Sequence, residues 1–571
     1  MQPFRPSRGS VFLACAAGLA VVAFLVFYIP LRSSRSSPED PALPSVSVIP
    51  RARLAKRACT TLGSRVLQRV DNGTSPTRSG QVQLVPTYPN FVDGGLTHAS
   101  PYELTQHVPL FLYGHGIVRP GVYDRPASLT DISQTAASLL KFDGFQAPKG
   151  RSLDQALLPT GQRATPKLVI TLIWDSAGMD LLDRWPDSWP YLKAFRAHGA
   201  WFSRAEVGSS PSNTPPSHAT IGTGAYPRLH GMVDEYVMID GVLQKPNEQG
   251  SASMAEPTFA DVYDLAKGNR PLVAEMGSLS AHVMMMGHGL QWPGGDADIA
   301  IAREVEDSGT GGDDTGGAWS LTSVMAPYYT LPDYANDPEI DAVLERAKDD
   351  LDQADGKMDG KWRDQSIEGM HDGFNTPART PYQTALFEAV IDHEGFGRDR
   401  VPDLLYLNYK IMDTLGHQFS ADGVELSDAL QVQDRDLHAF VDFLNDRVGK
   451  GQWVMLLTAD HGMQRDPAAI GAFPIDIDDI EAALQGAFGG EDGQPVVIKA
   501  RPTQIWLDED VLASRGATLE DVSSLLLSLT QGETVGAVTP EPGHEDDRVF
   551  DAVFPSSLLD HMPCLHGDPA G

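Results

Sequence analysis

The sequence contains few cysteines and is short of basic residues. Its 571 residues include only 3 Cys, too few for a disulfide framework or a cysteine-rich zinc site. Lys and Arg total 44 against 76 Asp and Glu, which gives a net charge of -32. Neutralising a nucleic-acid duplex requires clustered positive charge, so we expect no duplex binding through a broad basic face.

The remaining composition is that of a globular protein with a sizeable core. Hydrophobic residues make up 42% and charged residues 21%, and 54 Gly with 42 Pro indicate many loops. No internal repeat is visible. In so acidic a chain, a phosphate-handling site must bring its own positive charge, and divalent metals held by carboxylates supply it.

The N-terminal region predicts a membrane anchor. After a short segment at 1–10, residues 11–29 are uncharged and mostly apolar, long enough as a helix to cross a bilayer, and we predict a signal anchor at 11–31. A cleaved signal peptide is the alternative, but no small-x-small site follows. The Ser- and Pro-rich stretch after it predicts a stalk or linker at 32–58.

Short apolar runs alternate with helical patterns from residue 167 onward. The runs at 168–174, 200–207, 404–407 and 453–458 predict strands, as do 82–85 and 108–113, and 129–140 has helical spacing. This alternation predicts an α/β fold with a large, mainly parallel sheet flanked by helices. We expect a cap or insertion at about 240–400, with loops in the Gly- and Asp-rich stretch 308–317.

Acidic and imidazole side chains follow three of these strands. They are Asp175, then Asp413 with His417, then Asp460 with His461. Any one Asp after a strand is more often a helix cap, but ligands of parallel sheets gather at the carboxyl ends of the strands. Asp413 and His417 are four apart, on one face of a helical turn, which suits a shared metal ion.

Thr214 stands at a predicted helix start. Pro215 is typical of a first helical position, so Thr214 would be the cap, beside free backbone N–H groups that welcome an anion. A Thr that only caps the helix is the alternative. Beside a metal, its hydroxyl would lose its proton and become a nucleophile.

Together these residues resemble the type I phosphodiesterase and nucleotide pyrophosphatase branch of the alkaline phosphatase superfamily. Five motifs occur in the family's order: Asp175 at a strand end, Thr-x-Pro-x-His at 214–218, Thr-Gly-x-Tyr-Pro-x-x-His-Gly at 223–231, Asp-x-x-Gly-His at 413–417 and Asp-His-Gly-Met at 460–463. The resemblance implies an alkaline-phosphatase-like sandwich and hydrolysis of phosphoesters through a phospho-threonine intermediate on Thr214.

The same resemblance implies two divalent metal ions, and the mixture of Asp and His ligands favours Zn²⁺, with Mn²⁺ as the alternative. One is expected on Asp175, Thr214, Asp460 and His461, the other on Asp413, His417 and a further His. In the family that His lies downstream, with a Val-Pro-x-x-x-Tyr-Gly segment after it. Here the matching segment, His98 to Tyr102 with 108–114, lies near the N-terminus.

A circular permutation would explain this order. We predict that 59–160 is a permuted segment of the catalytic fold, that 161–571 is its main part, and that His98 is the missing ligand, with His544 and His566 as rivals. The permutation would bring Cys59 and Cys564 together as a disulfide, with two unpaired thiols as the alternative. We expect the catalytic domain outside the cytoplasm, although the positive-inside rule alone points the other way.

One departure concerns substrate binding. The family's diesterases carry an Asn shortly after the His-Gly pair, where this chain has Glu235, and a carboxylate cannot donate to a phosphoryl oxygen. Asn213 is the expected substitute. Two other histidines, His282 and His288, are expected to line the core or a pocket wall.

The sequence therefore predicts a membrane-tethered phosphodiesterase or nucleotide pyrophosphatase acting on a small-molecule phosphoester. A phosphomonoesterase or phosphonate hydrolase on the same site is the second candidate. A catalytically silent cell-envelope binding protein is a third, and a lost ligand would mark it. A sulfatase is disfavoured, because that branch uses Cys or Ser in place of Thr214. Neither the physiological substrate nor the oligomeric state is encoded in a motif.

Overall fold

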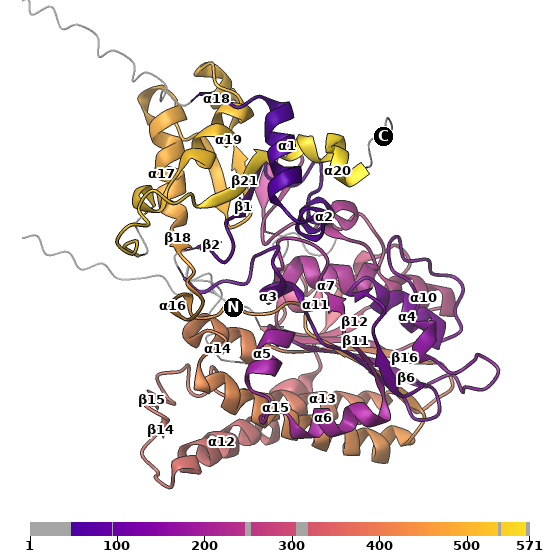
Figure 1. Ribbon diagram of the computed structural model, residues 1–571. Helices are drawn as coiled ribbons and strands as arrows, with labels where there is room; N and C mark the ends of the chain where they lie inside the picture. The colour runs from indigo at the N-terminus through magenta and orange to yellow at the C-terminus, as the bar shows by residue number, and fades with distance from the viewer. Residues whose placement is uncertain (1–46, 94, 246–252, 304–317, 535–537, 567–571) are drawn as a thin grey trace, which may run out of the picture. The chain divides into compact units, whose positions relative to one another are not determined.

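A computed structural model describes residues 47–93, 95–245, 253–303, 318–534 and 538–566 (Figure 1). The predicted anchor at 11–31 and the loop stretch 308–317 lie outside these ranges. Within the described part, no helix combines the length and the apolar character that a membrane span requires. The predicted linker at 32–58 overlaps helix α1 (Arg51–Thr61), whose apolar face at Leu54, Ala55 and Ala58 is buried.

Nine strands form the central sheet, in the order β13-β12-β11-β16-β6-β17-β3-β7-β4. Neighbours from β13 to β17 are parallel, whereas β3 runs antiparallel to both β17 and β7. The strands are β13 (Tyr329–Thr330), β12 (Asp298–Arg303), β11 (Val273–Leu279), β16 (Asp403–Tyr409), β6 (Leu168–Trp174), β17 (Trp453–Thr458), β3 (Leu110–Tyr113), β7 (Ala200–Phe202) and β4 (Gly121–Tyr123). This confirms the predicted large, mainly parallel sheet.

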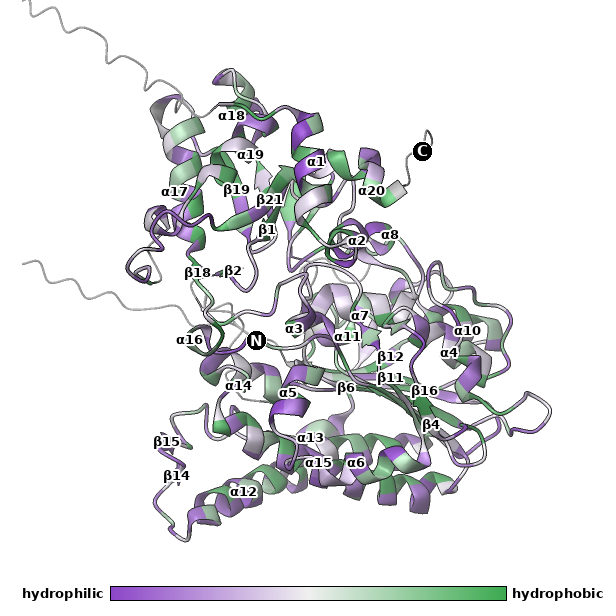
Figure 2. Cartoon of the chain, viewed as in Figure 1, coloured by the Kyte–Doolittle hydropathy of each residue, from purple (hydrophilic) through white to green (hydrophobic). Residues whose placement is uncertain are grey.

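Helices cover both faces of the sheet, as its apolar strands require. Strands β6, β16 and β17 are buried along their whole length, and β16 is strongly hydrophobic in Figure 2. One face carries α6 (Pro190–Phe195), α13 (Arg379–Val390) and α15 (Val424–Leu444); the other carries α4 (Asp131–Leu139), α7 (Thr214–Thr223) and α10 (Phe259–Lys267) (Figure 1). The outer helix α12 (Pro338–Asp352) has no buried residue.

A second, smaller sheet has its own core and was not predicted. It is antiparallel, in the order β19-β20-β1-β21, with strands β19 (Val497–Arg501), β20 (Gln504–Leu507), β1 (Val82–Pro86) and β21 (Phe550–Pro555). Helices α1 and α19 (Leu519–Ser528) pack on β21. Strand β1 lies between two strands from the C-terminal part of the chain, so both ends of the described chain build this core.

The segment predicted to be permuted is integrated into both sheets. Strand β1 is central in the small sheet, and β3 lies between β17 and β7 in the large one. Cys59 and Cys564 form a disulfide across 505 positions, with 5.8 Å between their Cα atoms. The arrangement is compatible with the permutation, which itself stays a prediction.

Candidate metal centre

The predicted site residues converge at the carboxyl ends of the central strands. Asp175 directly follows β6, and Asp460 lies two residues beyond β17. Helix α14 (Ile411–Phe419), which follows β16, carries Asp413 and His417. His98 comes from the loop between β2 (Phe91–Val92) and α3 (Glu103–Gln106).

Two groups of potential metal ligands form there. In what we call the His98 group (His98, Asp413, His417), one ligand atom from each residue lies within 4.8 Å of the others. The same holds for the His461 group (Asp175, Asp460, His461). The two groups adjoin, because the rings of His98 and His461 stack with centroids 3.7 Å apart. His98 joins a group and its rival His544 does not, whereas the side chain of the other rival, His566, lies outside the described part of the structure.

The imidazoles of both groups are oriented as metal ligands usually are. Nδ1 of His98 lies 2.8 Å from the Ser212 carbonyl, Nδ1 of His417 lies 2.7 Å from the Leu96 carbonyl, and Nδ1 of His461 lies 3.1 Å from the Gly462 carbonyl. A carbonyl can only accept, so each Nδ1 carries the proton and each Nε2 offers a lone pair.

Each carboxylate of the two groups also directs one oxygen at an imidazole Nε2 atom. Oδ1 of Asp175 and Oδ2 of Asp460 have no hydrogen-bond partner among the described residues, although both side chains are fully buried. They lie 3.7 and 3.2 Å from His461 Nε2. Oδ1 of Asp413 lies 3.5 Å from Nε2 of both His98 and His417. Buried carboxylate oxygens that face imidazole Nε2 atoms fit divalent cations.

Thr214 lies against the His461 group. Its hydroxyl is 3.2 Å from His461 Nε2, at the first residue of α7, and Asn213 is the N-cap. The helix start offers fewer free backbone N–H groups than predicted. Pro215 and Pro216 have none, and Ser217 donates its N–H to the Asn213 carbonyl. Among these first residues, the backbone N–H that remains beside the hydroxyl is that of Thr214 itself.

Burial and neighbouring charges set the protonation of the ligands. Burial and the charge of Asp460 raise the pKa of Asp175 to about 6. Burial alone would raise the pKa of Asp413, but Lys410 and His417 hold it well below its ordinary value. Burial, and then His461, lower the pKa of His98 well below its usual value, so its imidazole is neutral and free to bind a metal.

Sequence reasoning missed the residues that surround the ligands. Ser176 donates its hydroxyl to Asp413 Oδ1 at 2.7 Å, and Asn408 donates to Asp175 Oδ2 at 3.1 Å. Nε2 of His282 lies 3.4 Å from that same Asp175 oxygen. His282 was predicted to line the core or a pocket wall, and it lies against the ligands. The sequence indicates Ser176 and Asn408 only through their positions at the ends of strands.

The predicted substrate-binding residues form a separate polar cluster. Asn213 donates to Asp234 Oδ1 at 3.1 Å. Glu235 accepts a hydrogen bond from Arg501 at 2.6 Å, and Arg501 also contacts Asp234 at 3.2 Å. The carboxylate at the position of the family's Asn is thus paired with a guanidinium, and no pattern in the sequence indicates this pairing.

His288 contacts a second set of acidic side chains. We define this second acidic cluster as Asp261, Asp264, Glu275, Asp296 and Asp298. Nδ1 of His288 lies 2.6 Å from Asp261 Oδ2. Burial, and then neighbouring carboxylates, raise the pKa values of several acids of the cluster.

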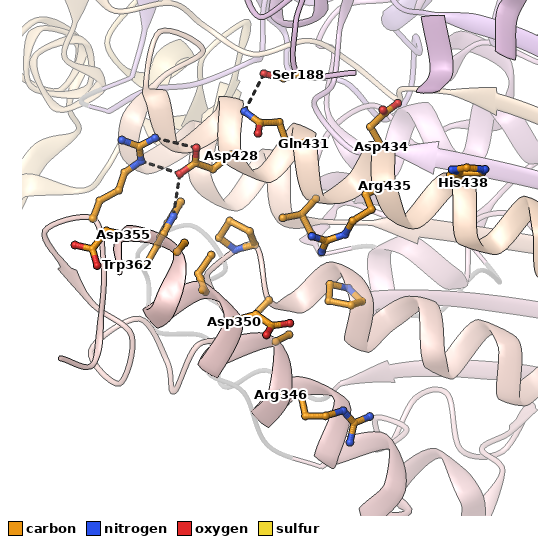
Figure 3. A pocket seen from close by; sticks show the side chains of 18 of the residues that line it. Ser188, Arg346, Asp350, Asp355, Trp362, Asp428, Gln431, Asp434, Arg435 and His438 are labelled. Carbon is orange, nitrogen blue, oxygen red and sulfur yellow. Dashed lines mark hydrogen bonds and ion pairs between the residues drawn. The ribbon is translucent and has the colours of Figure 1, made fainter. Parts of the chain in front are cut away.

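A cavity of about 910 Å³ lies elsewhere, among α12, α13, α15 and the strand β14 (Lys361–Trp362). Figure 3 shows Asp428 in its wall, which accepts hydrogen bonds from Trp362 and Arg363. No member of the His98 or His461 group lines this cavity, so its walls do not include the metal ligands.

Comparison with known proteins identifies relatives. The sequence profile of the type I phosphodiesterase / nucleotide pyrophosphatase family matches residues 169–549. Alkaline phosphatase PafA of Elizabethkingia meningoseptica is 30% identical over 161 residues, which are 27% of this chain and only 29% of PafA. Alkaline phosphatase PhoK of a Sphingomonas species is 25% identical over 416 residues, 66% of this chain and 72% of PhoK.

The fold agrees with these matches. The crystal structure of wild-type PafA superimposes with a TM-score of 0.50 at 19% identity, over 70% of this chain and 85% of that one. The family match begins beyond the segment predicted to be permuted and covers more than half of the chain. The chain therefore belongs to the type I phosphodiesterase / nucleotide pyrophosphatase family, a family of phosphoester hydrolases within the alkaline phosphatase superfamily.

Proposed function

We propose that this protein hydrolyses phosphoesters by nucleophilic attack of Thr214. The observation that carries the proposal is the position of the Thr214 hydroxyl, 3.2 Å from His461 Nε2, next to two adjoining groups of metal ligands. Two divalent ions, Zn²⁺ or Mn²⁺, bound there would polarise the phosphoryl group and lower the pKa values of the threonine hydroxyl and of water.

The chain's own residues hold the reacting groups. Helix α7 fixes Thr214 in line with the His461 group, and the backbone N–H of Thr214 lies at the positive end of that helix. Attack by the hydroxyl oxygen forms the O–P bond of phospho-threonine and breaks the bond to the leaving group, which takes up the proton that the hydroxyl loses. Water then attacks phosphorus, its proton passes to the departing Thr214 oxygen, and the phosphate product is released. Asn213, the residue before Thr214, is the expected side-chain donor for a phosphoryl oxygen.

A diester or nucleotide pyrophosphate is the first substrate class, because the family is defined by it. A phosphomonoester is the second, and the observation that favours it is that PafA and PhoK are named alkaline phosphatases.

We also propose that the catalytic domain lies outside the cytoplasm. The support is the Cys59–Cys564 disulfide, because such bonds persist in oxidising compartments and are rare in the cytosol. A membrane anchor at 11–31 stays a prediction.

The test compares hydrolysis of a nitrophenyl phosphodiester with that of the matching monoester, after Zn²⁺ loading of a protein that starts near residue 47. We expect Thr214→Ala and His98→Ala each to lower kcat/KM by about 10³-fold or more, since residues that act as a unit fail together. The controls are Thr60→Ala on α1 and His107→Ala in the same N-terminal segment, which should match wild type.

The outcomes separate the candidates. A wild-type preference for the diester supports the first substrate class, and a preference for the monoester supports the second. Full activity in His98→Ala would exclude His98 as a ligand. A wild-type protein that binds metal but hydrolyses neither ester would favour the catalytically silent binding protein.

A further inference from the structure

Lys410 contacts one ligand from each metal group. Its ammonium nitrogen lies 2.5 Å from Asp413 Oδ2 and 3.3 Å from Asp175 Oδ2. The side chain is 11% exposed, although lysines are among the residues least often buried. It follows β16 directly and stands three residues before Asp413. No recognised motif includes it.

Lys410 holds the carboxylate oxygens that face away from the imidazoles. The other oxygen of Asp413, Oδ1, lies 3.5 Å from Nε2 of His98 and of His417. The other oxygen of Asp175 lies 3.7 Å from His461 Nε2 and has no hydrogen-bond partner among the described residues. Each carboxylate thus offers one oxygen to its metal group and gives the second to the same ammonium.

We propose that Lys410 is a positioning residue that fixes Asp175 and Asp413 as single-oxygen ligands and joins the two metal positions. The proposal rests on the proposed two-metal site. It names a residue of the outer shell, whose loss in metalloproteins typically lowers metal affinity 10–100-fold.

Two effects of Lys410 on metal binding oppose each other. Its positive charge repels a nearby dication, so removing it would tighten binding if charge alone mattered. Removing it would also leave Asp413 Oδ2 buried without its cation, and would free that carboxylate to rotate. Because the contact is short and the pair is buried, we expect the loss of positioning to dominate.

The two metal positions should respond unequally. Asp175 Oδ2 keeps Asn408 at 3.1 Å and His282 at 3.4 Å when Lys410 is replaced. For Asp413 Oδ2, the short contact to Lys410 is the one ion pair found in the described part of the chain. The larger loss is therefore expected in the His98 group, which contains Asp413.

The experiment titrates Zn²⁺ into wild type, Lys410→Met and Lys410→Gln without substrate, and calorimetry measures the heat of binding. The matched control is Lys348→Met, which removes a lysine that also contacts two carboxylates, Glu345 and Asp372, but far from the metal groups. We expect two equivalents in wild type and in the control. In Lys410→Met, affinity should fall 10–100-fold at the position held by the His98 group and less at the other.

Lys410→Gln keeps a donor and loses the charge, so its loss should be smaller than that of Lys410→Met. Circular dichroism checks folding; if the Met variant does not fold, the Gln variant carries the test with the same direction expected. Unchanged or tighter binding in the folded variants would overturn the proposal for Lys410. Fewer than two equivalents in wild type would overturn it together with the two-metal site, whereas an inactive but metal-loaded wild type would overturn only the proposed function.

Discussion

Two buried sets of carboxylates lie in neighbouring parts of the central sheet, and they differ in what surrounds them. At the metal centre, the three aspartates share the space with the imidazoles of the two groups and with His282, Lys410, Asn408 and Ser176. In the second acidic cluster, beside β11, His288 pairs with Asp261. Strands β11 and β16 are adjacent, with Glu275 opposite Tyr406.

The surroundings decide what each set binds. Both oxygens of Glu275 lack a hydrogen-bond partner of normal geometry among the described residues, and the side chain is fully buried. Burial, and then the charges of Asp298 and Asp261, raise its pKa well above the ordinary value, and the backbone of Met286 offsets only part of this. Burial and the charge of Asp296 raise the pKa of Asp264 to about 7.

Buried carboxylates are therefore arranged to bind metal at the metal centre and to keep protons in the second acidic cluster. Among the described residues, carboxylate and imidazole atoms lie close enough together to hold a metal ion in the His98 group and in the His461 group. The second acidic cluster forms no such group there. Donors that fix one oxygen of each carboxylate make the difference.

The difference between the two sets is tested most strongly by neutralising one carboxylate in each. Asp413→Asn should lower kcat/KM at least about 100-fold, because even an outer-shell partner is typically worth 10–100-fold. Asp298→Asn should leave kcat/KM near the wild-type value, since its amide keeps the shape of a carboxyl whose pKa burial and the charge of Asp261 raise well above the ordinary value. Steady-state hydrolysis of a nitrophenyl ester measures both. A comparable loss in Asp298→Asn would show that the second cluster also serves catalysis.

A smaller effect is expected on metal-dependent stability. Saturating metal should raise the free energy of unfolding of wild type by about 3–4 kcal/mol at 100–1,000 times Kd. Calorimetric scans with and without a chelator measure this difference. Asp175→Asn should abolish most of it, and Glu275→Gln should keep it. A chelator effect that disappears in Glu275→Gln would mean that the second cluster holds a metal that stabilises the fold.

The sequence predicted which residues come together in the two candidate metal groups better than it predicted the residues that support them. Strands β6 and β17 have the predicted bounds, because uninterrupted apolar runs between polar loops are a strong signal of buried strands. Asp175 and Asp460 follow them, and α14 carries Asp413 and His417 on one face. His98 joined these residues through motif order, since no local pattern connects a loop at residue 98 with a helix at 413.

The small sheet and the outer shell could not be predicted. Strand β1 pairs with β20 and β21, more than 400 residues away in the chain, and short strands give no sign of such distant partners. The run predicted at 200–207 divides into β7 and β8 (Ala205–Glu206). Lys410, Asn408 and His282 act through contacts made in three dimensions, and a lone polar residue in an apolar stretch has many explanations.

The smallest predicted effect is a pH-dependent gain in stability at the second acidic cluster. Below the ordinary pKa of a glutamate, Glu275 is protonated in both the folded and the unfolded chain, so its ionisation does not affect stability. As pH rises toward its raised pKa, the unfolded chain releases the proton while the folded chain keeps it, so folding is progressively disfavoured. Glu275→Gln removes this cost, so its Tm should exceed that of wild type by a few degrees at pH 8 and by less at pH 5. An equal shift at both pH values, or a lower Tm with loss of bound metal, would contradict the assignment of this cluster to protons.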